Sequence, residues 1–137
     1  MNEQVGQFLA NLSEFFLFFV AAAVLTVVFV AIYTRITKHN EIALIKENST
    51  AAALAFAGSL IGFALPLAST MINSINIVEM VLWGLVALIV QVLVYLFIRL
   101  PMPRVSERIE AGEVAAGIWL GTCSMVAGIL NAASMTT

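Results

Sequence analysis

Four long apolar stretches limit what this 137-residue chain can fold into. They cover residues 15–33, 51–72, 77–98 and 114–134, and each is close to the roughly 20 residues that a helix needs to cross a bilayer. The stretches are continuously apolar rather than alternating, and so few strands could not close a barrel. We therefore expect an all-α membrane protein in which residues 1–137 form a single domain of four transmembrane helices.

Composition excludes several other classes of protein. Hydrophobic residues make up 62% of the chain and charged residues only 10%, whereas soluble domains have about 45–50% and about 25%. Six Lys and Arg residues are too few for a surface that follows nucleic-acid phosphates. A single Cys and a single His cannot complete the roughly four ligands of a zinc site. We expect no metal, no cofactor and no nucleic-acid partner, and a lipid bilayer around most of the chain.

The basic residues predict how the helices are oriented. All six lie in two connecting segments, between the first two stretches and between the last two: Arg35, Lys38, Lys46, Arg99, Arg104 and Arg108. Basic residues close to transmembrane helices stay on the cytoplasmic side. Both termini are therefore expected in the periplasm or outside the cell. Residues 1–14 contain no Lys or Arg, so the first stretch is interpreted as a retained helix rather than a signal peptide.

The two halves of the chain resemble each other at an offset of about 65 residues. The motif Asn11-Leu-Ser-Glu14 aligns with Asn76-Ile-Val-Glu79, and Ser59 aligns with Ser124. Each half, about 11–72 and about 76–137, holds two helices, so both halves enter the membrane from the same side. The pattern predicts two parallel two-helix repeats related by an axis along the membrane normal.

Small residues distinguish the second and fourth stretches from the other two. The second contains Gly58 and Gly62, and the fourth contains Gly117 and Gly121. A spacing of four places both glycines of a pair on one helix face, where two backbones can approach closely. We expect these two helices to form the inner packing surface, with the first and third helices facing lipid. The sequence leaves open whether the glycine faces meet within one chain or between two chains.

Glu14 and Glu79 have two interpretations. Carboxylates in membrane segments often mark routes for ions or protons. Both residues, however, are expected at the outer ends of their helices, three residues after an Asn, and Asn-x-x-Glu there is typical of a capping box. Negative charge is also favourable at a helix N-terminus. Capping is the favoured interpretation, and an ion or proton pathway is the alternative.

Pro66 and Gln91 are the next candidates for a polar pathway. Pro66 interrupts the second stretch and leaves the carbonyl of Gly62 without its usual helical donor. Gln91 lies deep in the third stretch. Its expected role is a hydrogen bond to a neighbouring helix, and lining a pore is the alternative.

Asn131 takes the place in the fourth stretch that Pro66 takes in the second. Together with Thr122, Ser124 and Ser69, these residues could line a small polar cleft. A tolerated kink with hydrogen bonds between helices is the more usual arrangement.

No set of catalytic residues is recognisable in the sequence, so no enzymatic activity is expected. Cys123 lies in the fourth apolar stretch and is interpreted as a small packing residue. His39 lies in the charged first connection, where a solvated histidine is the favoured interpretation.

The segment from Glu41 to Ser69 resembles the signature of a bacterial membrane family. It reads EIALIKENSTAAALAFAGSLIGFALPLAS, and a weaker copy, IEAGEVAAG, occurs at residues 109–117. The family is that of the YjfL-like inner-membrane proteins, the domain-of-unknown-function 350 family, and the resemblance covers essentially the whole chain. It implies a multi-pass protein of the bacterial inner (plasma) membrane, with a structural or stress-related role in the envelope and no assigned biochemical activity.

Two functions are compatible with these features. The first is a non-enzymatic membrane component that works through helix contacts, either as a homo-oligomer or with another membrane protein. The second is a small channel or transporter subunit that uses Glu14 and Glu79, with Gln91, Pro66 and Asn131 along its pathway.

Overall fold

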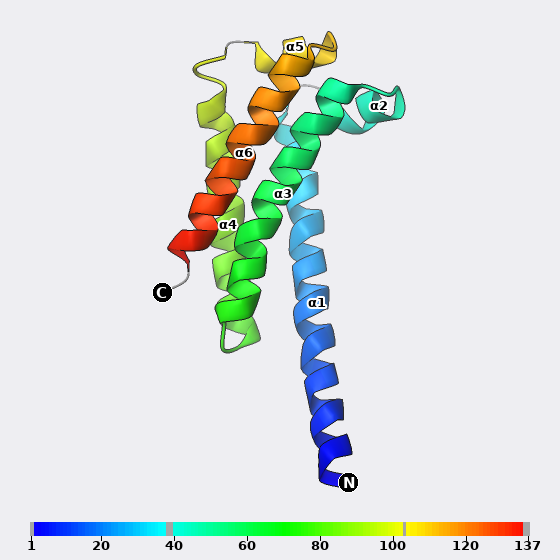
Figure 1. Cartoon of the computed structure of the whole chain (residues 1–137), viewed down its shortest axis with the longest axis vertical. Coiled ribbons are helices and arrows are strands. Elements are labelled where there is room, and N and C mark those ends of the chain that lie inside the picture. The colour runs from blue at the N-terminus through cyan, green and yellow to red at the C-terminus, as the bar shows by residue number, and fades with distance from the viewer. Residues whose placement is uncertain (1, 38–39, 103, 136–137) are drawn as a thin grey trace.

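The computed structural model describes residues 2–37, 40–102 and 104–135, and every regular element in them is an α-helix (Figure 1). Four helices are long and apolar enough to cross a membrane: α1 (Asn2–Ile36), α3 (Thr50–Asn73), α4 (Ile77–Ile98) and α6 (Val114–Ser134). Two six-residue helices, α2 (Glu41–Lys46) and α5 (Val105–Glu110), lie in the connections α1–α3 and α4–α6. The all-α class and the four spans are confirmed.

The first helix is longer than predicted. α1 begins at Asn2 rather than at residue 15, and its 35 residues extend about 52 Å at a rise of about 1.5 Å per residue. The prediction was wrong because it followed the fully apolar run alone. Residues 2–14 alternate apolar and polar residues with the helical period, which favours continuing the helix. α1 therefore exceeds the roughly 30 Å of bilayer hydrocarbon, and its N-terminal part projects past the other helices (Figure 1).

Side-chain caps begin two of the spanning helices. The hydroxyl of Ser49 accepts a hydrogen bond from the backbone N–H of Ala52 at 3.3 Å, at the start of α3. The side-chain oxygen of Asn76 accepts one from the N–H of Glu79 at 2.9 Å, at the start of α4. Such caps satisfy backbone donors that have no partner within the helix.

The same turn ends both short helices. Asn48 after α2 and Gly112 after α5 have left-handed backbones, with φ of 70° and 82°. In each turn the next N–H reaches back five residues to a carbonyl, from Ser49 to Leu44 and from Glu113 to Arg108. This is the Schellman arrangement, and it needs a glycine or an asparagine at the left-handed position. These turns direct the chain into α3 and α6.

α3 lies at the centre of the bundle. Half of its most apolar 18-residue window is buried, compared with 33% in α4, 33% in α6 and 17% in α1. Its most extensive interface is with α6, which runs in the same direction (Figure 1). α1 packs against α3 and α4 only through its C-terminal half, where its buried residues lie: Ala22, Leu25, Phe29 and Tyr33.

Candidate functional site

Glycines bring the backbones of α3 and α6 into direct contact. A Cβ built on Gly58 would overlap the backbone of Gly121, and one on Gly117 would overlap that of Ala51. Further along the interface, a Cβ on Gly62 would overlap the backbone of Ser124. All four glycines predicted to pack therefore lie on one interface, and their faces meet within a single chain. We call this α3–α6 interface the glycine seam.

Gly128 belongs to the glycine seam as well, although the sequence analysis did not single it out. A Cβ on Gly128 would overlap the backbone of Gly62. The signal was present, because Gly128 follows Gly121 by seven residues and so lies on the same helix face.

Gln91 supplies the hydrogen bond that Pro66 removes. Pro66 is buried within α3 and has no N–H to donate to the carbonyl of Gly62, four residues earlier. The side-chain amide of Gln91, from α4, donates to that carbonyl at 3.0 Å and lies 3.5 Å from the carbonyl of Ser124. Gln91 is only 3% exposed. One side chain thus satisfies a buried carbonyl and ties α4 to the glycine seam.

Three hydroxyls meet at the centre of the bundle. The Oγ of Ser59 lies 3.0 Å from the hydroxyl of Tyr33 and 3.3 Å from the Oγ of Ser124. All three residues are at most 3% exposed. They link α1, α3 and α6, and buried hydroxyls of this kind must be hydrogen-bonded to be tolerated in a membrane.

A carboxylate lies close to this cluster, at the end of the bundle where α2 and α5 lie (Figure 1). Glu41, the first residue of α2, is 1% exposed and interacts electrostatically with the buried Tyr33. Nearby, the hydroxyls of Tyr95 and Ser106 lie 3.2 Å apart, and the ring of Tyr95 meets that of Tyr33 edge-on. Sequence reasoning missed Glu41 and both tyrosines. A tyrosine near a helix end is usually taken as an interfacial anchor, and nothing local marks one that is buried.

The two predicted carboxylates lie in different surroundings. Glu79 is half-buried at the start of α4. The side chain of Asn76 caps the helix through the N–H of Glu79, and the Oε2 of Glu79 lies 3.5 Å from the N–H of Ile75, one residue before the cap. Glu14 is exposed and lies 12 residues inside α1, so the capping interpretation of Asn11 and Glu14 is wrong. A cap can form only where a helix begins, and α1 begins at Asn2.

The polar residues predicted to line a cleft between α3 and α6 do not gather in one place. The hydroxyl of Ser69 donates to the carbonyl of Ala132 at 3.1 Å, which links the two helices. The buried amide nitrogen of Asn131 has no hydrogen-bond partner among the residues that the structure describes, and Thr122 is exposed. Glu79 instead lines a hollow of about 140 Å³ with residues from three helix ends: Thr70, Asn73, Ser74, Trp83 and Met135.

Within residues 2–37, 40–102 and 104–135, no three His, Cys, Asp or Glu side chains are placed to hold a metal ion. Cys123 is a half-buried free thiol on α6. His39 lies outside the described residues.

Comparison with known proteins gives the family. The profile of a family described as Domain of Unknown Function (DUF350) matches residues 7–135. The chain is 44% identical over 128 residues to the UPF0719 inner membrane protein YjfL of Escherichia coli strain K12, covering 93% of this chain and 97% of that protein. The match to YjfL of E. coli O157:H7 has the same extent, and no solved structure matches. With four helices able to span a membrane, the chain belongs to the DUF350 family of inner-membrane proteins.

Proposed function

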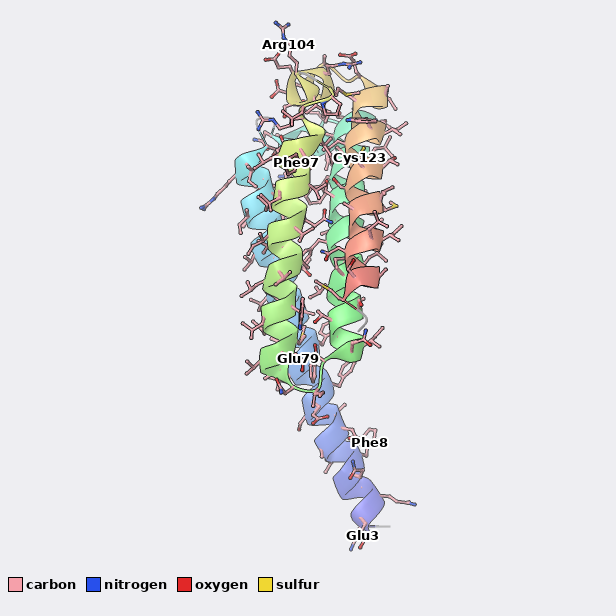
Figure 2. The ribbon with its side chains drawn as sticks, turned by 90° about the vertical axis from the view of Figure 1, so that its left-hand side faces the viewer. Glu3, Phe8, Glu79, Phe97, Arg104 and Cys123 are labelled. Carbon is pink, nitrogen blue, oxygen red and sulfur yellow. The ribbon has the colours of Figure 1, made fainter. Side chains whose placement is uncertain are left out.

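We propose that this protein is a non-enzymatic component of the bacterial inner membrane, with a structural or envelope-stress-related role, that works through helix contacts. The observation that carries this proposal is the N-terminal part of α1, which extends past the other described helices (Figure 1). Phe8 is 63% exposed and Leu9 is 56% exposed, on a helix that continues beyond the bundle (Figure 2). These residues precede the apolar run 15–33 that is expected in the hydrocarbon, and an exposed apolar surface outside the hydrocarbon is typical of an interaction site.

Extraction of the intact protein from native membranes tests this proposal. In mild detergent or nanodiscs, native mass spectrometry should detect a complex heavier than the 14.7 kDa chain. Chemical cross-linking in the membrane before extraction provides the matching control for complexes lost in detergent. A strict monomer in both experiments, with no co-purifying protein, would contradict a role through helix contacts.

We also propose that both termini face the periplasm. α2 and α5 lie at the same end of the bundle, and the described basic residues gather there: Arg35, Lys46, Arg99, Arg104 and Arg108. The positive-inside rule assigns that end to the cytoplasm. Alkaline phosphatase fused to Met1 or Thr137 should be active, and a cytoplasmic reporter at the same positions should not. The opposite result would invert the orientation.

The duplication into residues 11–72 and 76–137 also remains our proposal. Contacts across the glycine seam join residues at offsets close to 65, such as Ser59 with Ser124 and Gly62 with Gly128. Both halves also use a Schellman turn before their second spanning helix, at Asn48 and Gly112. Equivalent residues that touch are expected where two parallel repeats meet at a two-fold axis.

A second candidate function, a small channel or transporter subunit, is favoured by the buried polar side chains. Five polar side chains, each at most 3% exposed, lie between the end of the bundle that carries the basic residues and its interior: Glu41, Tyr33, Ser59, Ser124 and Gln91. Ionisable groups inside membrane proteins are expensive and often functional. This arrangement favours a proton-conducting role that starts at Glu41, with Glu79 at the opposite end of α4.

Proton flux into liposomes separates the two candidates. If the second is correct, purified protein should raise proton permeability, and Glu41→Gln should remove at least about nine-tenths of the increase. Glu14→Gln serves as the matched control, because Glu14 is exposed on α1 and should leave the flux unchanged. A permeability equal to that of empty liposomes, or a flux that survives both Glu41→Gln and Glu79→Gln, contradicts transport through carboxylates.

A further inference from the structure

We propose that residues 2–16 of α1 bind the same segment of a second copy of this chain. The two helices lie parallel and meet along Val5, Phe8, Leu12 and Phe15. This inference rests on the proposed function and names the partner that the exposed part of α1 contacts. Figure 2 shows the segment from Glu3 through Phe8 lying beyond the end of the bundle, past Glu79 at the start of α4.

The segment separates apolar from polar residues cleanly. Val5, Phe8, Leu12 and Phe15 follow one another in steps of three, four and three, the spacing of a helix–helix seam. Leu9 and Phe16 widen the same face. All six are at least 37% exposed, so this apolar face is uncovered along its whole length.

The hydrocarbon core of the bilayer cannot cover this face along its whole length. A helix of 35 residues is about 52 Å long, and it would have to tilt by roughly 55° to fit within about 30 Å of hydrocarbon. Transmembrane helices tilt by about 0–40°. With the apolar run of residues 15–33 in the hydrocarbon, about 13 residues of α1 project beyond it, through the headgroup region and towards water.

The projecting part of α1 becomes more stable when its apolar face packs against a partner. Most helical stability in proteins comes from the packing of an apolar face. The four uncovered residues of this part, Val5, Phe8, Leu9 and Leu12, provide that face.

Orientation and charge favour a second copy as the partner. All copies insert in the same direction, so their projecting segments lie parallel and at the same height. At about 100° per residue, Glu3 and Glu14 lie on the side of the helix opposite Leu12. The residues beside the apolar face are the uncharged Gln4 and Asn11. Two copies can therefore bring their apolar faces together without placing carboxylates against each other.

Disulfide cross-linking in native membranes tests the contact. The full chain carries Cys123→Ala, which removes its only cysteine, and then either Leu12→Cys on the apolar face or Glu14→Cys on the polar face. On mild oxidation, we expect at least about ten times more covalent dimer from Leu12→Cys than from Glu14→Cys. Equal yields, or more dimer from Glu14→Cys, would overturn the proposed contact between the apolar faces of two copies.

A second measurement does not depend on introduced cysteines. In nanodiscs, native mass spectrometry should show a dimer for the unmodified chain and for Glu14→Gln, and at least a tenfold smaller dimer fraction for Leu12→Glu. Leu12 is exposed in the single chain, so this change should not disturb the bundle. A monomer that retains a different protein would overturn the second-copy contact but leave the proposed function standing. A monomer with no partner would contradict both.

Discussion

The glycine seam region and the projecting part of α1 use the same residue types for different purposes. Gly58, Gln91 and Asn76 each meet a specific partner: the backbone of Gly121, the carbonyl of Gly62 and the N–H of Glu79. In α1, a Cβ on Gly6 would meet nothing within 4 Å, and the exposed amides of Gln7 and Asn11 lie 3.3 Å apart on one face. The contribution of a residue to stability therefore depends on what its helix face contacts. Substitutions at a residue of the bundle can be compared with substitutions at the same residue type in α1: Gly58 with Gly6, Gln91 with Gln7, and Asn76 with Asn11.

The glycine pair should give the largest difference. In Gly58→Leu the new side chain must displace the backbone of Gly121, which cannot rotate away. We expect the free energy of unfolding to fall by about 3 kcal/mol or more, the upper part of the range for overpacked cores. Reversible unfolding in mixed micelles of increasing SDS content measures this change.

Gly6→Ala is the matched control for Gly58→Leu. It adds a methyl group where there is open space and removes a flexible residue from a helix, so the helix should become more stable by about 0.5–1 kcal/mol. A Gly58→Leu protein with unchanged stability would mean that α3 and α6 do not pack through their backbones.

Substitutions at Gln91 and Gln7 should change the free energy of unfolding less, but they test one specific hydrogen bond. In Gln91→Leu the buried carbonyl of Gly62 loses its donor, and we expect a loss of about 1 kcal/mol, typical of hydrogen bonds between membrane helices. In a Pro66→Ala background the N–H of residue 66 can donate to that carbonyl again, so the same change should cost almost nothing. A double-mutant cycle isolates this coupling from the packing cost of either change.

Gln7→Leu is the matched control for Gln91→Leu, and its effect on stability should be close to zero because Gln7 is exposed. A cycle without coupling between Gln91 and Pro66 would show that the amide does not replace the missing backbone donor.

The sequence was sufficient to predict the spans but not all of their ends. The approximate ranges 77–98 and 114–134 agree with α4 and α6, whose starts are marked by Asn76 and the connection around Gly112, where the apolar pattern is interrupted. α1 has no such interruption, and hydropathy marks where lipid begins rather than where a helix begins. The wrong start of α1 also made the capping role predicted for Glu14 wrong, because that role was inferred from the distance of Glu14 to a helix end.

The candidate site could be predicted only in part, for a similar reason. Glycine spacing identified one face of α3 and one of α6, and Pro66 identified the carbonyl that needs a donor. That Gln91 supplies this donor depends on how α4 rotates against α3, which periodicity does not specify. The burial of Glu41 depends on how the α1–α3 connection folds back over the bundle, and its local sequence is that of a solvated charged segment.

The asparagine pair should give the smallest effect, and it tests where α1 begins. Asn76 and Asn11 occupy the same Asn-x-x-Glu motif, but only Asn76 precedes a helix. Asn76→Ala removes the bond to the N–H of Glu79 and should lower the free energy of unfolding by about 0.5–1 kcal/mol. Asn11→Ala places the best helix former inside α1 and should leave stability unchanged or slightly increased. The same unfolding titration compares the two variants. An equal loss in both would mean that α1 starts at residue 12 in the membrane, so that residues 2–11 could not form the helical contact with a second copy.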